Sequence, residues 1–241
     1  MARKTALGYS GLVGNIVLYE INGKQFMRTR PVRHKKPKNA TKARTELFGE
    51  VSRCGSQMLK LLKPQLRFHF TLAVYNTFRG WLRNAYAQNK DAGTWELQCK
   101  SNLACQLNPE ADLRDFMEGP FVVRDEGKGM VSIDIPSINP VRQIKAMNKV
   151  KCVKIKFALL SCAFGKAYSD ALINMEEHSI DLIDEQIPSK TISIKNKNTA
   201  SGNIALVIVA FEYEKYAAVK DKFVTDKKWL PVGVIAVGRL K

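Results

Sequence analysis

The sequence has few of the residues that metal centres and enzymes use most. There are 3 histidines and 5 cysteines among 241 residues. The histidines are scattered, and no two cysteines have the C-x2-C spacing of a zinc site. No glycine-rich segment matches a Walker or a dinucleotide-binding fingerprint. We therefore expect no metal, no cofactor, no small-molecule substrate and no enzymatic activity.

Long apolar runs are also missing. The longest covers residues 204–211, eight residues in all, which is too short to cross a bilayer. The first residues, Met-Ala-Arg-Lys-Thr-Ala, contain no apolar stretch typical of a secretory signal. An odd number of cysteines fits a compartment that keeps thiols reduced. We expect a protein of the cytoplasm, or of the interior of a phage particle, with no membrane partner.

Acidic residues are absent from residues 24–44, which contain nine Lys and Arg. The whole chain has a formal net charge of +17. Residues 1–67 contain 15 basic and 3 acidic residues, and therefore account for +12 of that charge. Such a concentration of charge indicates a polyanionic partner, of which nucleic acid is the commonest.

A β-hairpin is predicted immediately before this basic stretch. Asn22 and Gly23 form the dipeptide that best tolerates a type I′ turn between two strands. A two-residue loop would place Tyr19 opposite Phe26, with Arg28 and Arg30 on the same face of the hairpin. Aromatic rings beside arginines could stack on unpaired bases. Alternatively, this face could pack on helices with the arginine heads reaching water.

After the hairpin, Pro31 and Pro37 favour an extended basic arm. Arginine can pair with phosphate through its planar fork, and lysine acts as a point charge. No element has the features of sequence-specific base reading, so we expect contacts to the nucleic-acid backbone. The predicted nucleic-acid-binding residues are Tyr19, Lys24, Phe26, Arg28, Arg30, Arg33, Lys35, Lys36, Lys38, Lys42 and Arg44.

The remaining pattern predicts an α+β fold. Apolar residues at helical spacing predict helices over 41–62 and 66–89, which we expect to form an antiparallel pair. A short helix is predicted at 113–118 and a short strand at 94–99. Seven strands are then predicted, which favours a C-terminal antiparallel β-sandwich. They cover residues 121–124, 130–135, 150–162, 179–184, 191–195, 203–213 and 231–240.

The resulting domain division is a hairpin with a basic arm at 1–44, a helical region at 45–119 and a β-sandwich at 120–241. Within the helical region, Trp81 and its aromatic neighbours could form a base-stacking platform. Their helical spacing fits a hydrophobic core better.

Two other groups of residues contain the side chains of possible chemical sites. Cys54, His69 and Asp112 contain the functional groups of a hydrolytic triad, but no local motif joins them. Glu176, Glu177 and His178 could chelate a metal, yet the pair of histidines four residues apart in a zinc helix is missing. A solvent-exposed segment preceding a strand explains the second group better.

The chain resembles an uncharacterised family of Bacteroidota and their phages or mobile elements. The resemblance rests on residues 8–14 (GYSGLVG), 28–31 (RTRP) and 37–41 (PKNAT), on residues 76–89, and on a β-rich C-terminal half. It covers about the first 90 residues, and the density of lysines at 35–36 exceeds that expected of the family. The resemblance supports this architecture and implies no activity.

These features predict a non-enzymatic nucleic-acid-associated protein that contacts the phosphate backbone, of RNA or single-stranded DNA in preference to a duplex. A structural subunit of a phage virion or another self-assembling particle is the alternative. In that case the arm would reach homo-oligomeric neighbours or the packaged genome.

Overall fold

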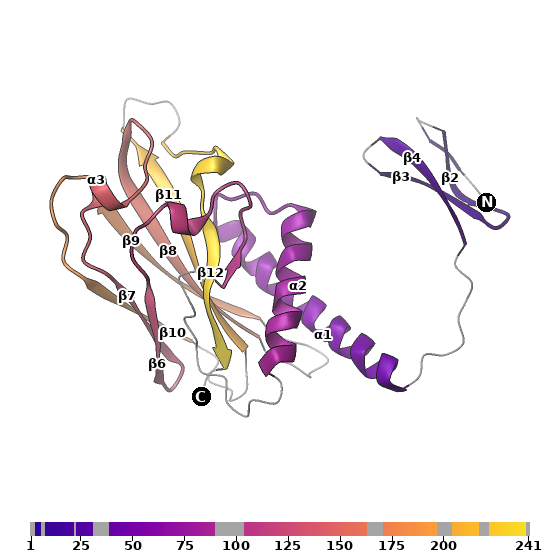
Figure 1. The fold of residues 1–241 in the computed structure, drawn as a ribbon, viewed down its shortest axis with the longest axis horizontal. Helices are drawn as coiled ribbons and strands as arrows, with labels where there is room; N and C mark the ends of the chain where they lie inside the picture. Colours follow the sequence, from indigo (N-terminus) through magenta and orange to yellow (C-terminus); the bar gives the residue numbers. More distant parts are fainter. Residues whose placement is uncertain are drawn as a thin grey trace. The chain divides into compact units, whose positions relative to one another are not determined.

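The structure is a computed structural model, and it divides into two compact units, Met1–Thr45 and Glu46–Lys241. The residues that it describes are 3–5, 8–21, 23–30, 39–89, 104–162, 171–196, 204–216 and 222–239. Helices and antiparallel sheets are both present (Figure 1), which confirms the α+β class.

A four-stranded antiparallel sheet forms the N-terminal unit. Its strands follow chain order: β1 (Arg3–Thr5), β2 (Gly8–Val13), β3 (Ile16–Ile21) and β4 (Lys24–Thr29). The first two strands were not predicted, because glycines interrupt the alternation of side chains in this part of the sequence.

The pairing of β3 with β4 has the register expected for a two-residue loop. Tyr19 lies opposite Phe26 and Val17 opposite Arg28. Gly23 has a φ of +74°, which is the left-handed conformation that a type I′ turn requires.

Two helices belong to the next part of the chain, α1 (Asn39–Leu62) and α2 (Leu72–Asn89). The second begins six residues later than predicted. Leu66, Phe68 and Phe70 are buried, and the residues between them are exposed. This period of two is that of an extended chain, which buries alternate side chains. Thr71 then caps α2, because its hydroxyl accepts a hydrogen bond from the Val74 backbone N–H at 3.4 Å.

Two further antiparallel sheets make up the rest of the larger unit. One has three strands in the order β10-β7-β6, and the other has five in the order β5-β12-β11-β8-β9. Their bounds are β5 (Cys105–Gln106), β6 (Val122–Gly127), β7 (Met130–Ile135), β8 (Val150–Cys162), β9 (Leu172–Asp181), β10 (Lys190–Lys195), β11 (Ile204–Lys215) and β12 (Val232–Arg239). The short helix α3 (Pro140–Gln143) follows β7.

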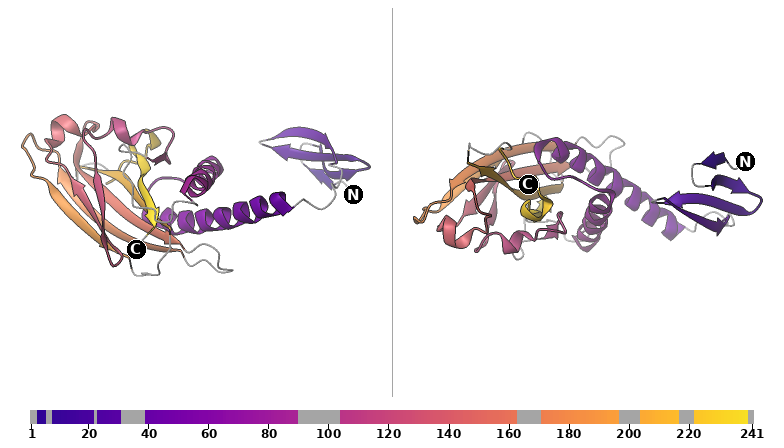
Figure 2. Two further views of the ribbon diagram at one scale, coloured as in Figure 1. Left: turned by 60° about the horizontal axis from the view of Figure 1, so that its bottom comes forward. Right: turned by 90° about the horizontal axis from the view of Figure 1, so that it is seen from above.

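The five-stranded sheet is covered on both faces. On β8, Phe157 and Leu159 belong to a core shared with the three-stranded sheet, whereas Ala158 and Leu160 belong to a core shared with α1 and α2. Figure 2 shows the helices against one face of this sheet. Because both faces are covered, β8 and β11 (Ile204–Lys215) have nearly continuous apolar runs and not the alternation of a half-exposed strand.

Several predicted elements differ from those observed. The strand predicted at 179–184 is β9, which begins at Leu172 and pairs along its length with β8. Its edge position explains the polar residues that obscured it in the sequence. The helix predicted at 113–118 is only a 3-10 turn, Leu113–Asp115. The strand predicted at 94–99 lies outside the described residues. The three-part domain division stays a prediction, although α1 and α2 share a core with the five-stranded sheet.

Candidate nucleic-acid interface

The clearest candidate surface lies on one face of the N-terminal sheet and consists of Tyr19, Phe26 and Arg28. The rings of Tyr19 and Phe26 are stacked, with centroids 5.8 Å apart and planes at 21°. The Arg28 guanidinium carbon lies 5.6 Å from the Tyr19 ring centroid. An arginine over an aromatic ring is a cation–π arrangement that orients the guanidinium group. We call these three residues, with Lys24 and Arg30, the Tyr19 face.

Strand alternation places the charges and the rings together. Lys24, Phe26 and Arg28 are two residues apart along β4, so their side chains leave the same face. Every residue of β4 is exposed, and Phe26 retains 43% of its accessible surface. Within the described part of the chain, no ion pair joins Lys24, Arg28 or Arg30 to a carboxylate. The face therefore combines exposed π surface with cations that are available to an anion.

The opposite face of the same sheet is apolar and also exposed. Val13, Ile16 and Met27 retain 51%, 41% and 73% of their accessible surface. Exposed apolar side chains on adjacent strands of one sheet are typical of a contact surface. The two faces thus differ in chemistry, with one suited to an anion and the other to an apolar partner.

The remaining predicted binding residues lie further along the chain. Arg33, Lys35, Lys36 and Lys38 fall outside the described residues. The backbone is helical from Asn39, so Lys42 and Arg44 belong to α1 and not to an extended segment. The structure describes only the backbone at these two positions.

The residues with the functional groups of a hydrolytic triad, Cys54, His69 and Asp112, do not form one. The Cys54 thiol is buried in α1, and its pKa is raised by a hydrogen bond with Cys162 and by burial. A raised pKa removes the thiolate that a nucleophile needs. Asp112 caps a 3-10 turn and pairs with Arg114, whose hydrogen bond holds the pKa of this carboxyl below its usual value. His69 is exposed on the connector before α2.

The segment Glu176, Glu177 and His178 lies within β9 and not before a strand. Consecutive side chains of a strand alternate between faces, so Glu177 points away from its two neighbours. Glu177 pairs with Lys154 at 2.9 Å, and His178 Nδ1 lies 3.2 Å from Lys190 Nζ. In the part of the chain that the structure describes, no group of three His, Cys, Asp or Glu residues could hold a metal ion.

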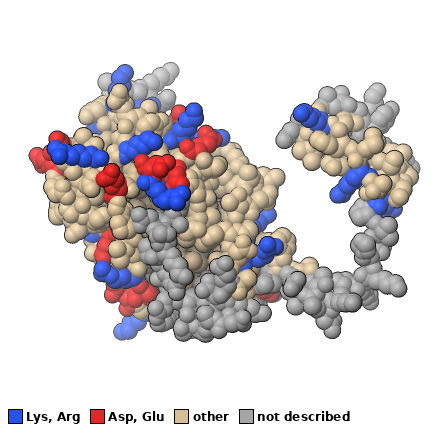
Figure 3. Space-filling view, viewed as in Figure 1, with Lys and Arg blue, Asp and Glu red and all other residues tan. Residues whose placement is uncertain are grey.

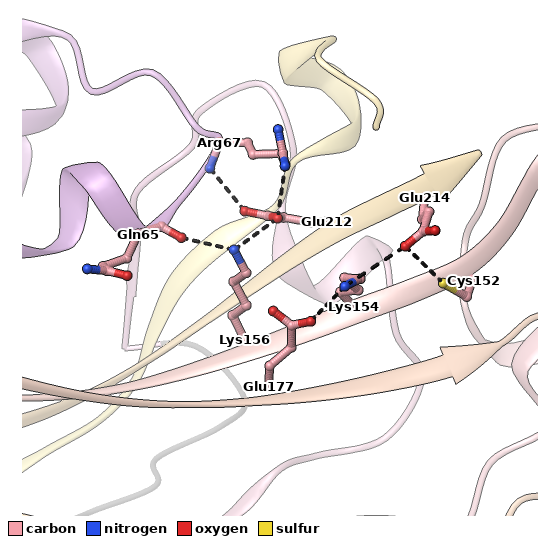
Figure 4. Close-up of polar contacts among 8 residues, drawn as sticks. All are labelled: Gln65, Arg67, Cys152, Lys154, Lys156, Glu177, Glu212 and Glu214. Carbon is pink, nitrogen blue, oxygen red and sulfur yellow. Dashed lines mark hydrogen bonds and ion pairs between the residues drawn. The ribbon is translucent and has the colours of Figure 1, made fainter. Parts of the chain in front are cut away.

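A buried carboxylate that sequence reasoning missed joins the helical connector to the five-stranded sheet (Figure 4). Glu212 on β11 accepts a hydrogen bond from the Arg67 backbone N–H at 3.0 Å, and its other oxygen lies 3.0 Å from Lys156 Nζ. Lys156 also donates to the Gln65 carbonyl at 3.0 Å. The position of Glu212 directly after an apolar run could have indicated a buried, paired carboxylate. Its partners identify a structural role.

The stacked sheets differ in charge from the N-terminal unit. On the face shown in Figure 3, their lysines and arginines are mixed with aspartates and glutamates. Beyond residue 67 the chain has 24 basic and 19 acidic residues. The described helices include none that is long and apolar enough to cross a membrane. No family model, no curated protein and no solved structure matches this chain.

Proposed function

We propose that the protein is a non-enzymatic nucleic-acid-associated protein that contacts a phosphate backbone through the Tyr19 face and the basic residues that follow it. The observation that supports this proposal is the stack of Tyr19 on Phe26 beside Arg28, in which Phe26 and Arg28 are exposed and Tyr19 is half-buried. Aromatic stacking beside unpaired cations suits a strand whose bases are unpaired, so RNA or single-stranded DNA is preferred to a duplex.

The basic residues at 31–44 follow the Tyr19 face in the sequence. Each lysine or arginine that neutralises a phosphate releases counterions, and this entropy gain drives binding without a need for exact placement. The nine basic residues between 24 and 44 therefore provide affinity, and the aromatic pair provides the preference for single strands. A protein with this function would act in the cytoplasm or inside a phage particle.

Binding of the full chain to fluorescent single-stranded RNA and DNA across a salt series tests this proposal. The test variant has Lys24, Arg28 and Arg30 changed to Gln. For single strands, log K falls as log salt rises, and each lost phosphate contact makes this negative slope shallower by about 0.7. We therefore expect a slope shallower by about 2. Absence of binding at low salt, or a slope equal to that of the wild type, contradicts the proposal.

A matched control removes the same charge from the part of the larger unit that follows α2. Lys151, Lys195 and Lys228 are exposed, and none of them forms an ion pair with another described residue. Changing these three to Gln should leave the slope within about 0.7 of the wild type. Equal losses in the two variants would show that net charge alone governs binding.

The second candidate function is that of a structural subunit of a phage virion or another self-assembling particle. The exposed apolar face formed by Val13, Ile16 and Met27 favours it, because a neighbouring subunit could cover that face. In this reading the two stacked sheets form a β-sandwich that makes lateral contacts. Sedimentation of the purified chain without nucleic acid separates the two, since ordered assembly supports the second function and a monomer supports the first.

A further inference from the structure

The helical layer contains a second concentration of positive charge. Residues 51–89 include six Lys and Arg and no Asp or Glu. The apolar residues of α1 and α2 face the five-stranded sheet, among them Val51, Met58 and Phe78. The charged residues must therefore project from the sides of the helices that the sheet does not cover.

The two helices meet at Gly55 of α1. A Cβ atom there would lie 3.4 Å from Cγ of Arg79 and 3.5 Å from a methyl of Leu82. This close approach brings Arg79 on α2 next to Ser56, whose hydroxyl oxygen lies 2.8 Å from Arg79 Nη2. The contact joins the outer sides of the two helices at one point.

Arg79 is held in a fixed orientation at this point. Its Nη2 donates to Ser56, and the guanidinium carbon lies 5.7 Å from the Tyr75 ring centroid. The Ser56 hydroxyl donates in turn to the Ser52 carbonyl at 2.6 Å. The Arg79 Nε–H is buried and has no acceptor in the structure. Because Nε is buried, an anion would bind the other N–H groups of this oriented, half-buried guanidinium.

Three more cations lie around this contact. Arg53 and Lys60 are three residues before and four residues after Ser56, so they share its side of α1. Arg83 is one helical turn after Arg79 on α2. All three are exposed, and among the described side chains none of them pairs with a carboxylate. We call Arg53, Lys60, Arg79 and Arg83 the helical basic surface.

We propose that the helical basic surface is a second nucleic-acid contact, which binds the phosphate backbone of a single strand in the larger unit. The inference takes its class of partner from the proposed function, but it rests on different residues. Three guanidinium groups and one ammonium group match phosphate oxygens, and none of them reads a base edge. An acidic protein would need an apolar centre to its contact, and the four residues that form this surface are all cations.

Two contacts on one chain would act on the same strand. Once one contact is bound, the second meets the strand at a high effective concentration, so affinity rises without any new interaction. Strands long enough to reach both contacts should therefore bind more tightly than short ones.

The test uses the full chain with Arg53, Lys60 and Arg83 changed to Gln, beside the Lys24, Arg28 and Arg30 variant and the Lys151, Lys195 and Lys228 control. Binding to fluorescent single-stranded RNA is measured across a salt series. We expect the slope of the helical variant to be shallower than that of the wild type by about 2. The variant that combines all six substitutions should have a slope shallower by about 4. The control variant should keep the slope of the wild type.

The outcomes separate this inference from the proposed function. If only the variant of the Tyr19 face has a shallower slope than the wild type, the helical basic surface is not a contact and the proposed function stands. If only the helical variant has a shallower slope than the wild type, the second contact stands and the Tyr19 face is not the interface. If the wild type does not bind RNA or DNA at low salt, both proposals fail.

Arg79 is tested separately, because it packs against Gly55 and Tyr75. An Arg79→Lys substitution keeps the charge but loses the planar fork. We expect affinity for single-stranded RNA to fall several-fold, with a circular dichroism melt like that of the wild type. Unchanged affinity in a folded Arg79→Lys protein would exclude Arg79 from the contact.

Discussion

Arg67 and Glu212 are joined twice across 145 residues of sequence. The Arg67 backbone N–H donates to Oε1 of Glu212 at 3.0 Å. The side-chain Nε of Arg67 lies 3.3 Å from Oε2 of the same carboxylate. Arg67 also stacks on Phe223, with its guanidinium carbon 3.7 Å from the ring centroid. The connector between α1 and α2 is therefore held to the sheet by polar contacts as well as by its buried Leu66, Phe68 and Phe70.

We predict that Glu212→Gln destabilises the protein. The Glu212 side chain is 4% exposed and that of Lys156 is 16% exposed, so the substitution leaves a nearly buried ammonium without a counter-charge. Breaking a buried ion pair from one side costs about 3 kcal/mol of unfolding free energy. Urea denaturation measures this loss.

Arg142→Gln is the control for that experiment. Arg142 pairs with Asp184 at 3.1 Å, but both side chains are largely exposed. An exposed pair contributes less than about 1 kcal/mol. Equal losses in the two variants would contradict the structural role assigned to Glu212.

Phe26→Ala should weaken the binding of single-stranded RNA without changing its salt dependence. Loss of one stacked base costs about 1–3 kcal/mol of binding free energy, and no cation is removed. Met27→Ala on the opposite face of β4 is the matched control and should bind as the wild type does. A loss confined to Met27→Ala would place the contact on the apolar face.

The stability of the protein should fall in alkaline solution. Burial raises the pKa of the Cys105 thiol from its ordinary value of 9.0 to about 12, and the pKa of Cys54 is raised as well. The unfolded chain therefore loses these protons at lower pH than the folded chain does. The stabilisation is complete below pH 9 and is lost as the pH rises from 9 towards 12.

Replacement of a buried thiol tests this pH dependence. Between pH 9 and pH 11 the unfolding free energy of Cys105→Ala should fall less steeply than that of the wild type. The difference should be up to about 1.4 kcal/mol per pH unit. Urea denaturation at several pH values provides the comparison. The same alkaline decrease in Cys105→Ala as in the wild type would show that other groups cause it.

His178 should titrate below its ordinary range. Burial lowers its pKa first, and the charge of Lys190 lowers it further. The depressed pKa contributes stability above pH 6.5 that is lost as the pH falls. Lys190→Gln should raise the pKa of His178, as measured by NMR of the imidazole protons. An unchanged value would mean that Lys190 does not act on the ring.

Local patterns in the sequence were sufficient for much of the fold. The β3–β4 register follows from a two-residue loop at Gly23, and strands β7 and β8 begin and end where predicted. The stack of Tyr19 on Phe26 follows from that register. Each of these depends on residues close in sequence, so periodicity and turn chemistry are sufficient to predict them.

Which surfaces meet depends on contacts between elements that are far apart in the sequence. The sequence shows Arg79, Ser56 and Glu212 as ordinary polar residues, and their roles depend on partners 23 to 145 residues away. The extended connector after Pro64 is likewise stabilised by burial against the sheet, which overrides the helical spacing of its neighbours. Such contacts arise from packing between distant elements, so the pattern of residues within one element does not predict them.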